Sequence, residues 1–171
     1  MQKRARTPRL SRYYTLGRLV HSDTARARGI DNAAPPELLP NLRLLARGLD
    51  RIRLLLGHPL DISSGYRSPA LNAAVGGARN SQHAQGLAAD FTCPGFGPPL
   101  AVARALRDST IAFDTVIYEF EEWIHVSFTA APRRRILTIY DAAEGYLDGL
   151  LDRDRRPIAS ATGSASRRPR R

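Results

Sequence analysis

Two histidines and one aspartate are the residues of this chain best suited to hold a metal ion. His83 and Asp90 lie in the segment SQHAQGLAAD (residues 81–90), and His125 lies in WIHVS (residues 123–127). Two imidazoles and one carboxylate are a sufficient protein set for a catalytic Zn²⁺, which keeps its fourth position open for water. A structural zinc site is normally closed by four protein ligands, often thiolates. Because the chain has only Cys93 to offer as a thiolate, the ligand set favours catalysis.

Each of these residues also has a plainer interpretation. A single histidine is more often a hydrogen-bonded core or surface residue than a metal ligand, and we read His21 and His58 in that way. The spacing of His83, Asp90 and His125 is weak evidence by itself, and the helical His-Glu-x-x-His signature of many zinc proteases is absent. Asp90, however, lies on the polar face of an otherwise apolar strand, so it needs a cation or an arginine as partner.

Hydrolysis would also need a base, and three glutamates precede His125 within six residues: Glu119, Glu121 and Glu122. In an uninterrupted strand Glu119 would share the face of His125 and Glu122 would not. A predicted turn between them weakens this parity, so it favours Glu119 only modestly, and Glu121 reads as a solvated turn residue. Arg67, in SSGYRSP (residues 63–69), is either an anion clamp for a substrate carboxylate or oxyanion or a surface arginine.

Hydrophobic periodicity predicts the elements that would position these residues. The clearest helix is opened by Pro35-Pro36-Glu37 and ended by Gly57, and between residues 38 and 56 leucine and isoleucine recur at spacings of three and four. Other helices are expected at residues 22–29, from Ser68 to residue 75, and at 98–108. Strands are expected at residues 60–63, 87–92, 115–118, 123–128 and 136–140, with the third and fourth joined as a hairpin. In the second strand Leu87, Ala89 and Phe91 share one face and Asp90 lies on the other.

The formal net charge of +10 is concentrated at the ends of the 171-residue chain. Between Leu60 and Ala130, four arginines stand against seven acidic residues. The basic excess lies at Lys3, Arg4, Arg6, Arg9 and Arg12, at residues 133–135 and at residues 167–171. Basic ends suit a polyanion such as nucleic acid, anionic lipid or an acidic cell-wall polymer, although solvated tails are the plainer reading. We expect a disordered basic arm at residues 1–12, one domain at 13–150 and a basic low-complexity tail at 151–171.

The remaining bulk features exclude several classes. A single cysteine cannot form an intramolecular disulfide, and Cys93 reads as a small buried hydrophobe. No apolar stretch reaches the ~20 residues that a membrane-spanning helix needs. The basic start is not followed by an apolar signal core. We therefore expect synthesis in the cytoplasm, with a different route of delivery if the protein acts outside it.

Several ordered blocks of the sequence together resemble the zinc D-alanyl-D-alanine carboxypeptidase family. That family includes phage L-alanyl-D-glutamate endopeptidases and shares its fold with the Hedgehog signalling domain. The resemblance covers roughly residues 14–128, and its blocks are SGYRSP (64–69), Leu71-Asn72, Gly76-Gly77, Ser81-Gln82-His83 with Gly86, Ala88 and Asp90, Phe113-Asp114, Glu119 and WIHVS (123–127). It implies an α+β fold, with a small, mostly antiparallel sheet and flanking helices.

The resemblance also implies roles for individual residues. His83, Asp90 and His125 would bind Zn²⁺, and Arg67, Ser81 and Trp123 would face the substrate. Many relatives place the base three residues before the last histidine, which points to Glu122. The branch most similar to this sequence and the Hedgehog domain place it six before, which points to Glu119, and we prefer Glu119. The basic segment after about Arg133 has no counterpart in the family.

The implied activity is hydrolysis of the D-amino-acid-containing stem peptides of peptidoglycan by a monomeric zinc peptidase. The sequence does not separate a carboxypeptidase that removes D-alanine from a phage-type endolysin released through a membrane pore, whose basic ends would contact anionic envelope polymers. Two rival functions stay open. One is a non-catalytic, Hedgehog-like zinc module that binds cell wall or a protein partner, although such a module has no need of a base. The other is nucleic-acid binding through the basic ends, which would weaken steeply with salt.

Overall fold

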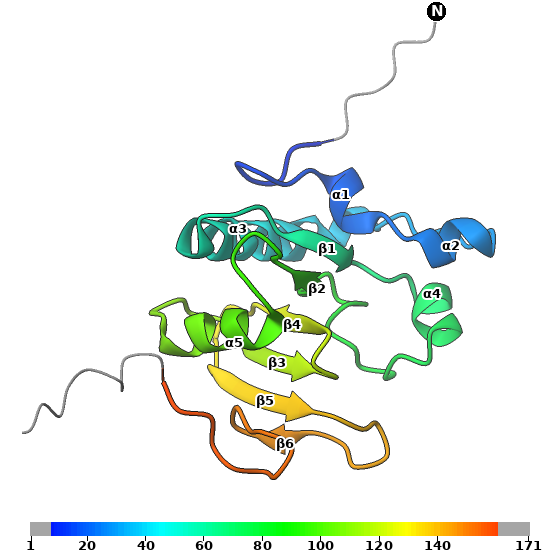
Figure 1. Ribbon diagram of the computed structural model, residues 1–171. Coiled ribbons are helices and arrows are strands. Elements are labelled where there is room, and N and C mark those ends of the chain that lie inside the picture. The colour runs from blue at the N-terminus through cyan, green and yellow to red at the C-terminus, as the bar shows by residue number, and fades with distance from the viewer. Residues whose placement is uncertain (1–7, 161–171) are drawn as a thin grey trace, which may run out of the picture.

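The computed structural model describes residues 8–160 and forms one six-stranded sheet with helices against it (Figure 1). The strands follow the order β1-β2-β4-β3-β5-β6. Their bounds are β1 (Asp61–Ser64), β2 (Ala88–Thr92), β3 (Thr115–Glu119), β4 (Trp123–Ser127), β5 (Arg135–Ile139) and β6 (Leu147–Asp148). The helices are α1 (Leu16–Val20), α2 (Asp23–Ala27), η1 (Pro36–Leu38), α3 (Leu39–Leu56), α4 (Pro69–Ala74) and α5 (Pro99–Asp108). The predicted α+β fold with a mostly antiparallel sheet is confirmed.

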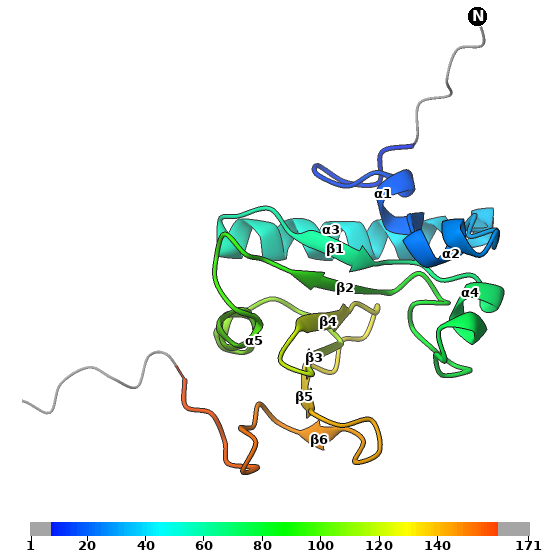
Figure 2. The same cartoon turned by 45° about the vertical axis from the view of Figure 1, so that its right-hand side comes forward.

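Helix α3 forms where the leucine periodicity predicted it. Leu42, Leu45, Leu49 and Ile52 are fully buried along one stripe, and burial of each such side chain contributes about 1.5–3 kcal/mol. The helix ends at Gly57, whose φ of 70° is the left-handed conformation that glycine adopts most readily. Helices α3 and α5 pack against each other and against the same face of the sheet (Figure 2). Their buried side chains form one core with Phe91, Ile124 and Val126 of the sheet.

The opposite face of the sheet carries the candidate ligands. Asp90 on β2 pairs directly with His125 on β4, and His125 pairs in turn with Ile117 on β3. Residues opposite each other in a ladder point to the same face, and neighbours along a strand point to opposite faces. Burial of Phe91 and Ile124 against α3 and α5 therefore turns Asp90 and His125 away from the core. A shift of one residue in the strand register would turn Asp90 and His125 into the core, and Phe91 and Ile124 out of it.

A tight turn decides where the glutamates before His125 lie. Phe120 and Glu121 have φ values of 53° and 64°, as expected for the two central residues of a type I′ turn, and the Glu122 N–H donates to the Glu119 carbonyl over 2.9 Å. Glu119 pairs with Trp123 across the hairpin. Because Trp123 lies two residues before His125, Glu119 shares the ligand face.

The structure adds elements that periodicity did not indicate. Helix α1 has only five residues and β6 only two, so neither is long enough to give a clear period. Strand β5, which was expected, pairs in parallel with β3. Its position extends the sheet beyond the hairpin. No helix within residues 8–160 combines the length and apolar character that a membrane crossing requires.

The described parts of the two predicted ends contact the domain. Leu10 is buried, and the Ser11 hydroxyl and the Arg12 N–H both donate to the Asp50 carboxylate over 2.9 Å. Ile158 packs against the main core. The rest of the predicted arm and tail, residues 1–7 and 161–171, lies outside the described part of the chain, and the domain limits stay a prediction.

Candidate metal centre

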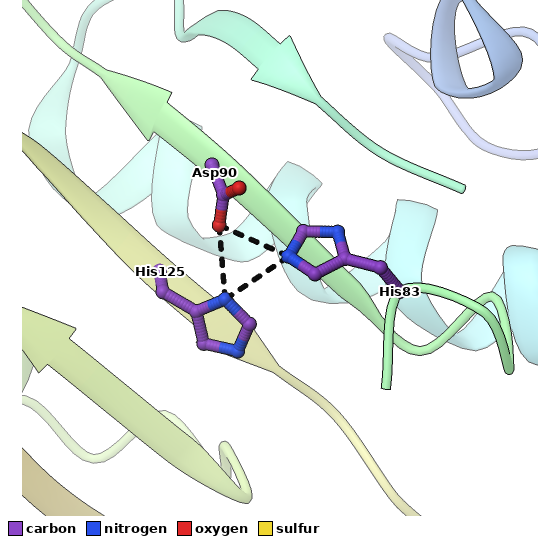
Figure 3. Close-up of side chains that lie close together, drawn as sticks. All are labelled: His83, Asp90 and His125. Carbon is purple, nitrogen blue, oxygen red and sulfur yellow. Dashed lines mark hydrogen bonds and ion pairs between the residues drawn. The ribbon is translucent and has the colours of Figure 1, made fainter. Parts of the chain in front are cut away.

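His83, Asp90 and His125 meet at one point on the free face of the sheet (Figure 3). His83 comes from the loop before β2, Asp90 from β2 and His125 from β4. Oδ1 of Asp90 lies 3.1 Å from Nε2 of His83 and 2.9 Å from Nδ1 of His125, and the two nitrogens are 3.2 Å apart. The ligand atoms of a tetrahedral zinc ion lie about 3.3 Å from one another, given zinc–ligand distances of ~2.0–2.1 Å. The three side chains therefore fit such an ion.

The protonation state of His83 is set by a backbone carbonyl. Its Nδ1 lies 2.7 Å from the carbonyl oxygen of Gly65. A carbonyl can only accept, so Nδ1 must carry the hydrogen and donate it. Burial lowers the pKa of His83, which favours neutral imidazole with a lone pair on Nε2. A histidine ligand held through its other nitrogen is the usual arrangement at protein metal sites.

The Asp90 carboxylate divides its two oxygens between the histidines and Arg67. Oδ1 faces His83 and His125, whereas Oδ2 accepts a 2.6 Å hydrogen bond from the Arg67 guanidinium. Arg67 also donates from Nε to the Ser64 hydroxyl over 2.8 Å. Burial by itself would raise the pKa of Asp90, but its contacts with His83 and His125 hold it below the usual range. An ionised carboxylate oxygen and two ring nitrogens thus lie together, and each of the three atoms can offer a lone pair to a cation at their centre.

A cavity of about 620 Å³ opens beside the three ligand candidates, and Glu119 is one of the residues that line it. Oε2 of Glu119 accepts a 2.9 Å hydrogen bond from the Trp123 indole N–H, which fixes the orientation of the carboxylate. Burial raises the pKa of Glu119, although His125 and the Trp123 bond act in the opposite direction. A carboxyl group with a raised pKa at the edge of a metal site is suited to accept and return a proton.

The other predicted site residues have separate positions. Ser81 and Arg67 line the 620 Å³ cavity, and Arg67 and Trp123 line a second cavity that also touches Asp90. Glu122 is exposed and lines a different pocket beside Pro98 and Pro99. Cys93 is in the core, with its thiol against the Pro59 carbonyl. The structure thus places Glu119 in the cavity of the ligand candidates and Glu122 in another pocket, while the identity of the base stays a prediction.

Three contributors to the site were not assigned roles from the sequence. Gly65 acts through its carbonyl, which no side-chain pattern can reveal. The Asp114 carboxylate, 1% exposed, accepts a 3.1 Å hydrogen bond from the Gln82 amide and so holds the loop that carries His83. The sequence signal for Asp114 was its position in a block that resembles the family. Tyr146 lines the cavity from the loop between β5 and β6. Burial, then Glu119 and Asp90, raise the pKa of its phenol, and no sequence pattern indicated a role for this residue.

Replacement of Gly65 by alanine is expected to lower the free energy of unfolding by about 1–3 kcal/mol. A Cβ there would collide with the Leu19 carbonyl oxygen, which is held by the Tyr66 N–H over 2.7 Å. Gly95→Ala is the matched control, since its Cβ would meet the exposed His58 ring at 2.6 Å, and that ring can turn away. Urea denaturation of both variants would measure the difference. Equal stability of Gly65→Ala and the wild type would contradict the expected collision.

Comparison with known proteins agrees with this geometry. A comparison with curated proteins gave no match. The sequence model of the family described as Peptidase M15 matches residues 12–127, which is more than half of the chain and includes all three metal-ligand candidates and Glu119. The family resemblance inferred from the sequence is therefore confirmed, and the chain belongs to the peptidase M15 family of metallopeptidases.

Proposed function

We propose that the protein is a zinc-dependent peptidase that hydrolyses the D-amino-acid-containing stem peptides of peptidoglycan. The observation that carries this proposal is the convergence of His83, Asp90 and His125 beside Glu119 in one cavity. The set has two imidazoles and one carboxylate, so zinc would keep a position for a reacting molecule. Membership of the peptidase M15 family supports peptide hydrolysis as the reaction.

A proton relay through Glu119 is the main contribution of the chain to the reaction. When bound, zinc supplies Lewis acidity, which polarises the peptide carbonyl and lowers the pKa of water toward ~7. Glu119 takes a proton from the attacking water as the water oxygen bonds to the carbonyl carbon. It then passes this proton to the leaving nitrogen as the C–N bond breaks. The Trp123 N–H keeps the carboxylate aimed at the cavity during both transfers.

Arg67 has two functions in this proposal. Its hydrogen bond to Oδ2 of Asp90 keeps Oδ1 directed at the histidines. Within residues 8–160, two of the five N–H donors of this guanidinium are engaged, by Ser64 and Asp90. The group lines the cavity with its remaining donors available, so it can stabilise the oxyanion that forms when the carbonyl is attacked.

The shape of the cleft favours cleavage of an internal bond. The 620 Å³ cavity and a second cavity of about 240 Å³ both touch Arg67 and Asp90, so space for a peptide continues on two sides of the ligands. The smaller cavity is lined by Ser63, Ser64 and Trp123, among others. A carboxypeptidase would instead need a cavity that is closed on one side of the scissile bond.

Mass spectrometry of muropeptides digested by the zinc-loaded protein tests this proposal. The expected products are fragments cut within the stem peptide, with a free amine on one and a carboxylate on the other. Loss of a single terminal D-alanine would instead identify a carboxypeptidase and contradict the internal cleavage. Stoichiometric zinc without turnover of any muropeptide would overturn the enzyme and support a binding module.

A further inference from the structure

The cleft extends into a part of the chain that the family match does not include. The match ends at residue 127, whereas Arg135, Leu137 and Tyr146 line the same cavity as the metal-ligand candidates. Arg135 and Leu137 belong to β5, and Tyr146 precedes β6. Figures 1 and 2 show the loop between these strands projecting on the same side as the chain that follows α4. One wall of the cleft is thus built by residues 128–148.

Tyr146 is an aromatic side chain that the fold does not use. It is 61% exposed, so its ring contributes little to the core. Among residues 8–160 its hydroxyl makes no hydrogen bond. A large, exposed aromatic ring with an unused hydroxyl beside a cavity is suited to contact a ligand, because one side chain supplies apolar area and a polar group.

The floor of this part of the cavity is apolar. Leu137 on β5 pairs with Ile117 on β3, which pairs with His125 on β4. The three side chains therefore stand in one row across the free face of the sheet. Ile117 and Leu137 are each 6% exposed. A substrate group that extends from the metal ligands toward β5 meets this aliphatic surface first.

Two arginines, Arg133 and Arg135, line the cavity beside this apolar surface, and their ion pairs differ in exposure. Arg133 is committed to Asp114, which is 1% exposed and accepts from its guanidinium over 2.9 and 2.6 Å. Arg135 pairs with Asp148 at 3.2 Å, and the Asp148 side chain is 89% exposed. Such an exposed pair contributes little to stability. A carboxylate of the substrate can therefore replace Asp148 and bind the Arg135 fork through two hydrogen bonds.

We propose that Arg135, Leu137 and Tyr146 form a substrate subsite that binds a carboxylate-bearing residue close to the scissile bond. In this subsite Arg135 binds the carboxylate, Leu137 contacts the aliphatic portion and the Tyr146 ring covers it from the loop. The inference rests on the proposed function, since it assigns a place to part of the same substrate. Its consequence is that amidation of this carboxylate, which removes the charge, weakens binding.

Two peptides that differ only by a carboxylate or a primary amide at this residue test the subsite. Binding is measured by calorimetry in the Glu119→Gln background, where hydrolysis does not interfere, with and without Arg135→Gln. We expect the carboxylate peptide to bind about tenfold more tightly to the protein that keeps Arg135, as for one charge-assisted contact at a half-exposed position. Arg135→Gln is expected to remove this preference. Arg156→Gln, which alters an exposed arginine paired with Asp154 at 3.3 Å, is the matched control and should retain it.

A second variant tests the aromatic wall, and kinetics separates the two proposals. Tyr146→Ala is expected to weaken binding of both peptides, because they share the apolar portion that the ring covers, and unchanged binding would remove Tyr146 from the subsite. Absence of a carboxylate preference, or its persistence in Arg135→Gln, would overturn the subsite. Failure of the Glu119-containing protein to cleave either peptide would overturn the proposed function, whereas the binding preference would still decide the subsite.

Discussion

Glutamine in place of Glu119 is expected to lower kcat for peptide hydrolysis about a thousandfold, within the range of ~10²–10⁴ for loss of a general acid–base group. The amide keeps the shape of the side chain and an oxygen that can accept the Trp123 N–H bond, so the cavity is preserved. It cannot take the proton of the attacking water. Because His83, Asp90 and His125 are unchanged, zinc content should match that of the wild type. Steady-state kinetics on a stem peptide and metal analysis of the same preparation measure both effects.

Glu122→Gln is the matched control for this experiment. The same change is made three residues along the chain, at an exposed side chain that lines a different pocket beside Pro98 and Pro99. Hydrolysis is expected at the wild-type rate. Full activity in Glu119→Gln together with loss of activity in Glu122→Gln would transfer the role of base to Glu122. Full activity in both variants would contradict a glutamate base in this hairpin.

Asparagine at position 90 is expected to abolish stoichiometric zinc binding and to reduce hydrolysis more than a thousandfold, as for removal of a central catalytic group. The carboxylate supplies the only negative charge among the three ligand candidates, and its Oδ1 lies within 3.1 Å of both facing imidazole nitrogens. The amide is nearly the same size, so packing around the site changes little. Zinc content measured by atomic absorption, together with hydrolysis rates, tests this expectation.

The same variant separates a metal effect from a folding effect. Zinc at 100 times its Kd is expected to stabilise the wild type by ~2.7 kcal/mol, because it binds only the folded chain. The melting temperature of the wild type should therefore rise when zinc is added and fall with a chelator, while that of Asp90→Asn should not respond. His58→Ala, at an exposed histidine outside the cluster, should respond as the wild type does. A zinc response retained in Asp90→Asn would place the metal elsewhere.

Much of the local structure follows from residue patterns within short segments. The leucine stripe of α3 and its glycine end, the alternation that turns Asp90 away from Phe91, and the hairpin around residues 120–122 all depend on neighbours a few positions apart. Periods of 3.6 and 2 express such local geometry directly. The three metal-ligand candidates could likewise be named from their residue types and the blocks around them.

The residues of the chain determined by themselves which side chains could hold a metal ion and which faces of the main elements are apolar. Tertiary structure alone decided which glutamate lies beside the ligands, since the turn at Phe120 and Glu121 sets the pairing of Glu119 with Trp123. It also decided that the Gly65 carbonyl orients His83, and that parallel pairing with β3 carries β5 to the cleft, where Arg135 and Tyr146 line the cavity. The physical reason is that these contacts join segments distant along the chain, and their geometry depends on how the sheet is ordered in space.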